Sequence, residues 1–322
     1  MEPIISPAPD FGLIWYSARE VLAGRNPYLA IGPGRAYNWN ANLYYPLPAV
    51  LLAVPFAWLT MRLATATFVA TSSGLLAFAV TRENWHRLPL FLSASSFIAA
   101  AWGQWSFAVT AAALLPWLGF VLAAKPTTGF AAFTYRPTAR AVLGGAAILM
   151  IAFAVQPGWV GDWLTAVRTA VPHFSPASGA PEQLSATIPY FAPVSRFGGF
   201  LLVLAVLRWR RAEARYLLVL SFIPQTMVLY ECVLLSLIPA TRLQAVTLAL
   251  LSYVAYRGSG LASQLWPAHP EYASQGHWIV VWQYLPCLAM VLLRPNVGDV
   301  PAWLERALVT VRRFTLQRRA IP

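Results

Sequence analysis

The chain has 322 residues, of which 58% are hydrophobic and 11% are charged, and its mean hydropathy is +0.58. A soluble domain carries about 25% charged residues, so this composition excludes a soluble globular protein and indicates a polytopic membrane protein. The net charge of +12 comes from 22 arginines and one lysine that lie between apolar runs, which favours contact with anionic lipid or phosphate over nucleic-acid binding.

The chain opens with a Pro-rich polar segment followed by PDFGLIWYSAREVL, for which we predict an amphipathic helix. Asp10 is expected to cap this helix, whose N-terminus would stabilise the ionised carboxylate, and Gly24 is expected to end it. One face of the helix is apolar: Phe11, Trp15, Ala18 and Leu22. Glu20, beside Arg19, is either a second carboxylate that orients an acceptor or a surface ion pair.

Nine apolar runs follow: 46–60, 63–81, 88–102, 105–124, 139–155, 197–207, 216–238, 242–256 and 278–293. A straight spanning helix needs about 20 residues, and several of these runs are shorter or contain Pro or Gly. Irregular backbone at membrane depth persists only where protein or a water-filled cavity covers it. We therefore predict an all-α transmembrane bundle of about 8–10 helices, several short or broken, with a break near Pro224 and an outward-facing cavity.

The arginines predict an orientation, because positively charged loops favour the cytoplasm. The cluster at 208–215 is expected to be cytoplasmic, as are the turns at Arg62 and Arg242, whereas Arg82 and Arg87 fall on the outer face. The predicted organisation in chain order is a first extracytoplasmic loop with an amphipathic helix (1–45), N-terminal transmembrane helices (46–156), a long extracytoplasmic loop (157–193), C-terminal transmembrane helices (194–293) and a basic amphipathic cytoplasmic tail on anionic lipid (294–322).

Four sequence blocks in order carry a resemblance to a known family. Asp-Phe, an aromatic pair and Asn-Pro-Tyr in the opening stretch are followed by LYYPLPAVLLAVPFAWLTM (43–61), WGQWSF (102–107) and FVLAAKPTTGFAAF (120–133). Together these resemble the Asp-containing first outer loop, the Tyr-Pro-Pro helix (with Leu47 for one proline), the Gly-Gln turn and the Lys-Pro helix end of glycosyltransferase family 87. These are integral-membrane enzymes of the GT-C superfamily.

The resemblance implies transfer of a hexose (mannose-like) or a pentose from a polyprenyl-phosphate donor to a lipid or glycan acceptor. It places the general base at Asp10, which would take the proton of the acceptor hydroxyl. It implies no metal and no cofactor besides the lipid-linked donor, because phosphate is already a good leaving group. The expected location is a bacterial inner membrane, with multiple passes and the active face extracytoplasmic.

Further residues are candidates for binding the donor phosphate or the substrate: Lys125, Arg168, His173, Arg196, Gln104 and Glu231. Each has a plainer interpretation as well. Lys125 could be a cation that snorkels at a helix end, and His173 a solvated loop residue. Glu231 lies within an apolar run, which predicts a functional carboxylate or a buried partner. The four histidines are scattered and suggest no metal site.

Two departures from the family keep other functions open. Family members carry a transmembrane helix before the Asp loop, whereas nine residues precede Asp10 here, so we expect either a start further upstream or an N-terminus that reaches the outer face without that helix. The family's aromatic–histidine–tyrosine pattern is replaced by Tyr230-Glu231. The alternative is a catalytically inactive GT-C-like scaffold or accessory subunit with a membrane-protein partner, followed by a transporter.

Overall fold

A computed structural model describes residues 9–39, 41–169, 191–226, 228–265, 274–298 and residue 300. This part of the chain is mostly helical, which confirms the predicted all-α class. The strands it contains, β1 (Ile31–Gly32) and β2 (Tyr37–Asn38), are two residues long and pair in parallel within the opening segment.

The helices before residue 170 are α1 (Pro9–Leu22), α2 (Pro27–Ala30), α3 (Leu47–Ala53), η1 (Val54–Phe56), α4 (Met61–Glu83), η2 (Trp85–Leu92), α5 (Ala94–Trp102), α6 (Ser106–Leu114), η3 (Pro116–Ala124), α7 (Pro126–Tyr135), α8 (Ala139–Val155) and α9 (Trp159–Arg168). After residue 190 come η5 (Pro193–Ser195), η6 (Gly199–Arg208), α11 (Ala212–Phe222), η7 (Leu229–Leu237), α12 (Arg242–Leu265), α13 (Gln275–Ile279), η9 (Val280–Tyr284) and α14 (Leu285–Leu292). Every predicted apolar run coincides with one or more of these helices, whereas α7 falls outside the runs.

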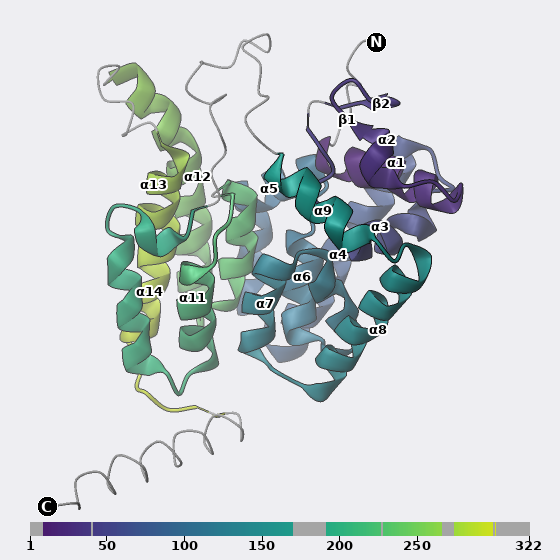
Figure 1. Cartoon of the computed structure of the whole chain (residues 1–322). Helices are drawn as coiled ribbons and strands as arrows, with labels where there is room; N and C mark the ends of the chain where they lie inside the picture. Colours follow the sequence, from purple (N-terminus) through teal and green to yellow (C-terminus); the bar gives the residue numbers. More distant parts are fainter. Residues whose placement is uncertain are drawn as a thin grey trace, which may run out of the picture.

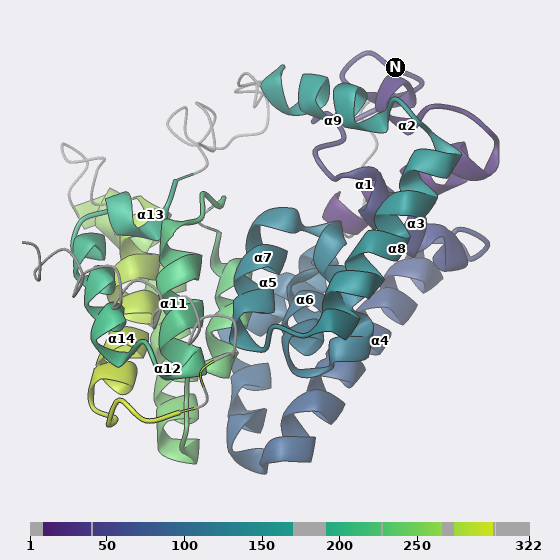
Figure 2. The ribbon, with the colours of Figure 1, turned by 60° about the horizontal axis from the view of Figure 1, so that its bottom comes forward.

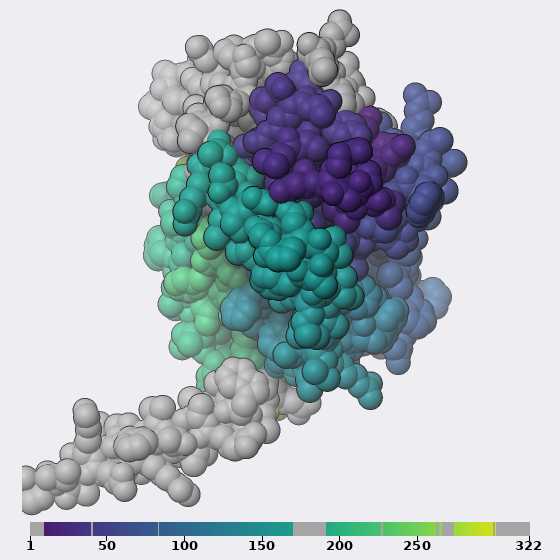
Figure 3. All heavy atoms as spheres, turned by 45° about the vertical axis from the view of Figure 1, so that its right-hand side comes forward, coloured from purple at the N-terminus to yellow at the C-terminus, as the bar shows by residue number. Residues whose placement is uncertain are grey.

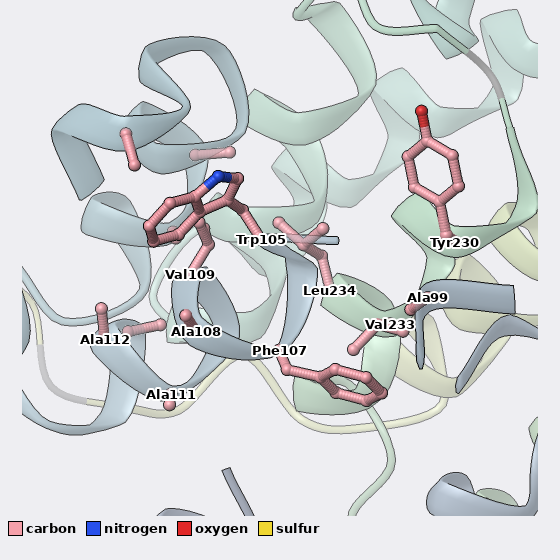
Figure 4. Packing of buried hydrophobic residues seen from close by; sticks show 14 of the residues in the cluster. Ala99, Trp105, Phe107, Ala108, Val109, Ala111, Ala112, Tyr230, Val233 and Leu234 are labelled. Carbon is pink, nitrogen blue, oxygen red and sulfur yellow. The ribbon is translucent and has the colours of Figure 1, made fainter. Parts of the chain in front are cut away.

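The helices form two groups that meet along η7. In Figures 1 and 2, α11 to α14 stand on one side and α3 to α8 on the other, with α1, α2 and α9 across one end. Figure 4 shows the packing where the groups meet: Phe107 from α6 lies against Val233 of η7, and the hydroxyl of Tyr230 points away from these apolar side chains. The core therefore lies between the two groups, and Tyr230 marks the end at which it becomes polar.

The predicted break near Pro224 is confirmed. Helix α11 ends at Phe222 and η7 begins at Leu229, so the apolar run 216–238 forms two helices. They lie side by side, because the Tyr216 hydroxyl donates to the carbonyl oxygen of Leu234 at 2.9 Å. Proline has no amide N–H and restricts the preceding residue, which explains why the run divides here.

By length and composition, one helix of the described residues could cross a membrane, the segment Met61–Arg82 of α4. Up to three spans result if each bent pair counts as one, namely α5 with α6 at 114° and α8 with α9 at 95°. The apolar run 105–124 is divided at Leu115 into α6 and η3, since Pro116 interrupts the backbone bonding. The number of about 8–10 spans stays a prediction.

The two ends of the bundle differ in charge. We call the end that carries α1, α2 and α9 the opening end, and the end that carries 208–215 and Arg294 the basic end. Arg87 donates to the carbonyl oxygens of Leu237 and Pro239 at 3.1 and 3.3 Å, and Arg294 donates to Ile238 at 2.7 Å. Arg87 therefore lies at the basic end.

This placement corrects the predicted arginine sides. Helix α4 begins beside α1, because the Trp15 indole N–H donates to the Phe56 carbonyl at 3.3 Å just before α4. Arg62 thus lies at the opening end, while Arg82, in the last turn of α4, lies toward the basic end. Relative to segment 208–215, each lies at the end opposite to the expected one, so Arg82 and Arg87 lie toward that segment and Arg62 lies away from it.

Two predicted segments fall partly outside the described residues. The predicted outer loop 157–193 begins with α9, and its residues 170–190, including His173, are not among those described. The predicted amphipathic tail lies almost entirely beyond residue 300, so its helix stays a prediction.

Candidate functional site

Helix α1 carries Asp10 in its first turn, after Pro9 at its first position. Asp10 therefore lies just inside the helix rather than at the cap that the sequence predicted. The apolar face of α1 is anchored on α4, since the rings of Phe11 and Phe68 stack at 4.4 Å. Burial of this face turns the first turn of α1 toward the bundle, and Gly24, at a φ of +69°, lies in the turn that follows the helix.

Gln104 meets Asp10 from the turn between α5 and α6. Gly103 caps α5 in the left-handed conformation (φ +65°), which glycine adopts without steric cost. The chain then turns back and leaves the Gln104 side chain fully buried. Its amide donates to the Asp10 carboxylate, and its carbonyl oxygen accepts from the Tyr45 hydroxyl at 3.4 Å. The Gly-Gln pair thus has a structural explanation, which is to bring a buried amide to Asp10.

Lys125 and Glu231 form an ion pair at the same end. Lys125 lies between η3 and α7, and its Nζ is 2.5 Å from Oε1 of Glu231 in the first turn of η7. The side chains are 15% and 3% exposed, so the pair is largely withdrawn from solvent. The ammonium also lies 5.1 Å from the ring centre of Tyr230, and the Thr226 hydroxyl is 3.5 Å from the same carboxylate oxygen.

Electrostatics couples the two pairs. Burial raises the pKa of Asp10 to about 7, Lys125 opposes this rise, and Glu231 adds to it. Asp10 therefore lies close enough to Lys125 and Glu231 to be affected by their charges. We therefore treat Asp10, Gln104, Lys125 and Glu231 as one polar cluster, drawn from four segments that are far apart in the sequence.

A shallow groove of about 370 Å³ runs along the outside of α4 and α5. Its lining is mostly apolar and includes one cation, Arg62. The other lining residues are Thr65, Ala66, Val69, Ala70 and Ala100. Phe68, next to Val69, stacks on the residue after Asp10, and the carbonyl of Ala100 accepts from Gly103 N at 3.2 Å. The groove therefore follows the outside of the helices that position Asp10 and Gln104.

The structure brings together four of the seven predicted site residues. Arg168 ends α9 and is exposed, and no contact described here joins it to the polar cluster. The Arg196 guanidinium instead stacks over Phe191 at 3.8 Å. His173 lies outside the described residues. The two arginines among the candidates for binding the donor phosphate or the substrate are thus not members of the cluster in this structure.

Glu20 forms an ion pair, as its plainer interpretation predicted, but the carboxylate is buried and not on the surface. Its carboxylate accepts two hydrogen bonds of 2.6 Å from Arg25 and one of 3.1 Å from the Tyr37 hydroxyl. Hydrogen bonding to Arg25 lowers the pKa of Glu20, so the pair holds α1 to the segment that follows it. The partner is Arg25 rather than the adjacent Arg19.

Sequence reasoning missed Tyr45 and Thr226 as neighbours of the polar cluster. Tyr45 lies in the Tyr-Tyr-Pro block, where its position before Pro46 is a usable signal, whereas nothing in the local sequence marks Thr226. Helix α9 covers this block, because the Trp163 indole donates to the Tyr44 carbonyl at 2.8 Å. Figure 3 shows the purple opening segment bordering the teal α9, which the hydrogen bond from Asn26 to Asp162 (2.8 Å) joins.

Among the described residues, no three or more His, Cys, Asp and Glu side chains gather in a way that could hold a metal ion. No family model, curated protein or solved structure matches the chain. The function is therefore argued from the polar cluster itself.

Proposed function

We propose that the protein is an integral membrane glycosyltransferase, which moves a sugar from a polyprenyl-phosphate donor to a lipid or glycan acceptor. The observation that carries this proposal is the meeting of Asp10, Gln104, Lys125 and Glu231 at one end of the bundle. It unites a carboxylate that can titrate near neutral pH with a cation in a largely buried setting. Single displacement at an anomeric carbon needs both groups.

In the proposed reaction, the Asp10 carboxylate accepts the proton of the acceptor hydroxyl as that oxygen attacks the anomeric carbon. The new carbon–oxygen bond forms while the bond from the anomeric carbon to the phosphate oxygen breaks. The phosphate leaves with the bonding electron pair, and the proton remains on Asp10. Gln104 holds the carboxylate in place through its amide, because the hydrogen bond fixes one of the two carboxylate oxygens.

Lys125 is the cation for the departing phosphate. In the structure, its charge is balanced by Glu231, which keeps the ammonium oriented within a largely apolar surround. A donor phosphate would share or take over this partner, so Glu231 is assigned a positioning role. The electrostatic gain is greatest where water is excluded, as at this pair.

The groove on α4 and α5 supports a lipid-carried donor. Its walls are mostly apolar, and its single arginine, Arg62, lies at the end where α4 begins. An apolar chain is the ligand that such a lining suits best.

A second function, a non-catalytic membrane scaffold, is favoured by one specific observation. Most of the polar cluster is paired internally, since Asp10 is bonded by Gln104 and Lys125 by Glu231, although Oε2 of Glu231 is buried with no hydrogen-bond partner in the described structure. A network of this kind can serve stability alone. The two proposals differ in whether Asp10 is needed for a reaction.

The test is transfer of radiolabelled sugar from polyprenyl-phosphate donors by the protein in membranes. Asp10→Asn is expected to abolish transfer, while Asp162→Asn, which changes a carboxylate that accepts bonds from Asn26 and Gln156 at the same end, retains it. Wild-type protein that folds and inserts but transfers sugar from no donor would overturn the proposal in favour of the scaffold. Equal activity of Asp10→Asn and wild type would remove Asp10 as the base.

A further inference from the structure

A dense group of arginines lies at the basic end, opposite the polar cluster. Segment 208–215 supplies four of them and Arg294 a fifth, and we call this set the basic rim: Arg208, Arg210, Arg211, Arg215 and Arg294. Its carboxylate, Glu213, lies 3.1 Å from Arg294 and 3.6 Å from Arg211. Among the described residues, one carboxylate balances one of the five charges of the rim, which is therefore strongly positive.

Carbonyl oxygens hold most of the rim in place without neutralising it. Arg208 donates to the carbonyls of Leu292 and Arg294 at 2.8 and 2.5 Å, and so ties η6 to the end of α14. Arg211 donates to the carbonyls of Pro295 and Val297 at 3.2 and 3.3 Å. Guanidinium groups fixed by neutral partners keep their full charge, so the rim is preorganised for an anion.

The guanidinium group of Arg210 has donor capacity left for an anion. Arg210 is exposed and lies over the Trp209 ring at 5.4 Å, which leaves its donors toward solvent. The Nε of Arg211 is buried and has no hydrogen-bond partner within the described structure. A phosphate group would accept from the exposed Arg210, since arginine forks match phosphate oxygens well, and the charge of Arg211 beside it adds to the attraction.

An apolar face leads up to the rim along η6. Six side chains of this helix are exposed: Phe200, Leu201, Val203, Leu204, Val206 and Leu207. Ten residues of 3₁₀-helix rise about 20 Å, which exceeds the roughly 15 Å of hydrocarbon in one leaflet. Leu293 and Val297, 84% and 68% exposed, extend the apolar surface beside the rim.

We propose that the basic rim binds the phosphate of an anionic glycerophospholipid whose acyl chains lie along η6. The apolar face of η6 fits an amphiphile, whereas free phosphate would use the arginines alone. Trp209, at the junction, suits the interface between headgroup and hydrocarbon. This proposal shares the membrane placement of the proposed function, but it does not depend on sugar transfer.

The test compares lipid binding to the purified full chain in detergent. Phosphatidylglycerol and phosphatidylcholine with the same acyl chains are titrated, and bound lipid is counted by native mass spectrometry. We expect tighter binding of phosphatidylglycerol, weakened about fivefold by Arg210→Gln and roughly thirtyfold by Arg210→Gln with Arg211→Gln, since each arginine near anionic lipid contributes about 1 kcal/mol. Added salt should weaken this preference.

Arg257→Gln is the matched control. Arg257 is also exposed and lies over the ring of the residue before it, Tyr256, at 5.8 Å, but on the part of α12 remote from the rim. Equal losses in Arg210→Gln and Arg257→Gln, or equal binding of the two lipids by the wild type, would overturn the proposal. Competition by millimolar inorganic phosphate that displaces phosphatidylglycerol completely would also overturn it, because the acyl chains would then contribute nothing. Sugar transfer, assayed separately in membranes, reports on the other proposal.

Discussion

Asp10 is held between opposing influences. The N-terminus of α1 and Lys125 favour the ionised carboxylate, whereas burial and Glu231 favour the protonated acid, and the balance raises its pKa to about 7. Burial is the largest of these effects. A general base works best when its pKa lies near the operating pH, so the environment of Asp10 suits the role that we propose for it.

The raised pKa of Asp10 predicts opposite pH effects on activity and stability. Transfer requires the carboxylate, so the rate should rise about tenfold per pH unit below pH 7 and level off above it. The folding stability changes in the opposite direction. Between pH 4 and 7 Asp10 is protonated in the folded state but ionised in the unfolded state, so folding stability falls as the pH rises, by at most about 4 kcal/mol.

Asp10→Asn should therefore be inactive yet melt at a higher temperature than wild type at pH 8, with no difference near pH 4. Thermal unfolding followed through the intrinsic fluorescence of the 14 tryptophans measures this. Asp162→Asn is the control, with no such pH-dependent gain expected. An Asp10→Asn variant less stable than wild type at pH 8 would show that the carboxylate supports the fold instead of opposing it.

The Lys125–Glu231 pair gives a second prediction at this scale. Lys125→Met leaves the Glu231 carboxylate without its cation in a largely buried position, which should cost about 3–5 kcal/mol. Lys125→Met with Glu231→Leu removes both charges and should recover most of that loss, although transfer stays absent. Melting temperatures of the two variants decide the matter. A double variant no more stable than the single one would mean that the pair holds the bundle together by itself.

At the scale of helices, glycine contacts set how closely η3 and α8 approach. A Cβ placed on Gly119 would lie 2.2 Å from Cα of Ala141, so backbone touches backbone there. The same construction on Gly145 meets its nearest atom, the carbonyl oxygen of Gly119, at 3.9 Å. Small residues at such contacts let membrane helices pack closely.

Gly119→Ala should therefore destabilise the protein by about 1–3 kcal/mol, because a backbone segment must move to admit the methyl group. Gly145→Ala, one turn away on the facing helix, should be neutral or slightly stabilising. Melting temperatures in detergent compare the two. Equal losses would imply that any methyl group in this region is harmful and that the close approach at Gly119 is not the cause.

The sequence predicted where helices break better than it predicted which side chains contact one another. Pro224 and Gly103 mark breaks through local backbone chemistry, and both breaks occur in the structure. The partnership of Lys125 with Glu231 joins residues 106 positions apart, and no local pattern contains that information. The same holds for the sides of Arg62 and Arg87, because the direction of α4 depends on how α1 packs and not on α4 itself. These contacts and placements depend on tertiary packing, which hydrophobic periodicity alone does not determine.

In the molecule as a whole, the polar cluster and the basic rim lie at opposite ends of the bundle. The polar cluster and α9 lie at the opening end, whereas the basic rim, Arg87 and the start of α12 lie at the other. A chain inserted in a membrane with its arginines toward the cytoplasm would therefore present the polar cluster on the outer side. That is the side where the proposed acceptor glycans are found.

This arrangement predicts sided chemical labelling. Arg168, at the opening end, and Arg242, at the basic end, are both exposed, so each can be replaced by cysteine and probed with a membrane-impermeant maleimide. The native cysteines, Cys232 and Cys287, are buried and give a low background. We expect Arg168→Cys to react in right-side-out vesicles and Arg242→Cys only in inverted ones.

Denatured samples, in which all cysteines react, provide the reference for complete labelling. Labelling of both variants from one side would mean that the two ends do not lie across a membrane from each other, and the lipid-facing role of η6 would fail with it. Labelling with the sides exchanged would keep the bundle in the membrane but put Asp10 in the cytoplasm, where extracytoplasmic transfer is excluded. The sidedness of two arginines thus tests the orientation on which the proposed reaction depends.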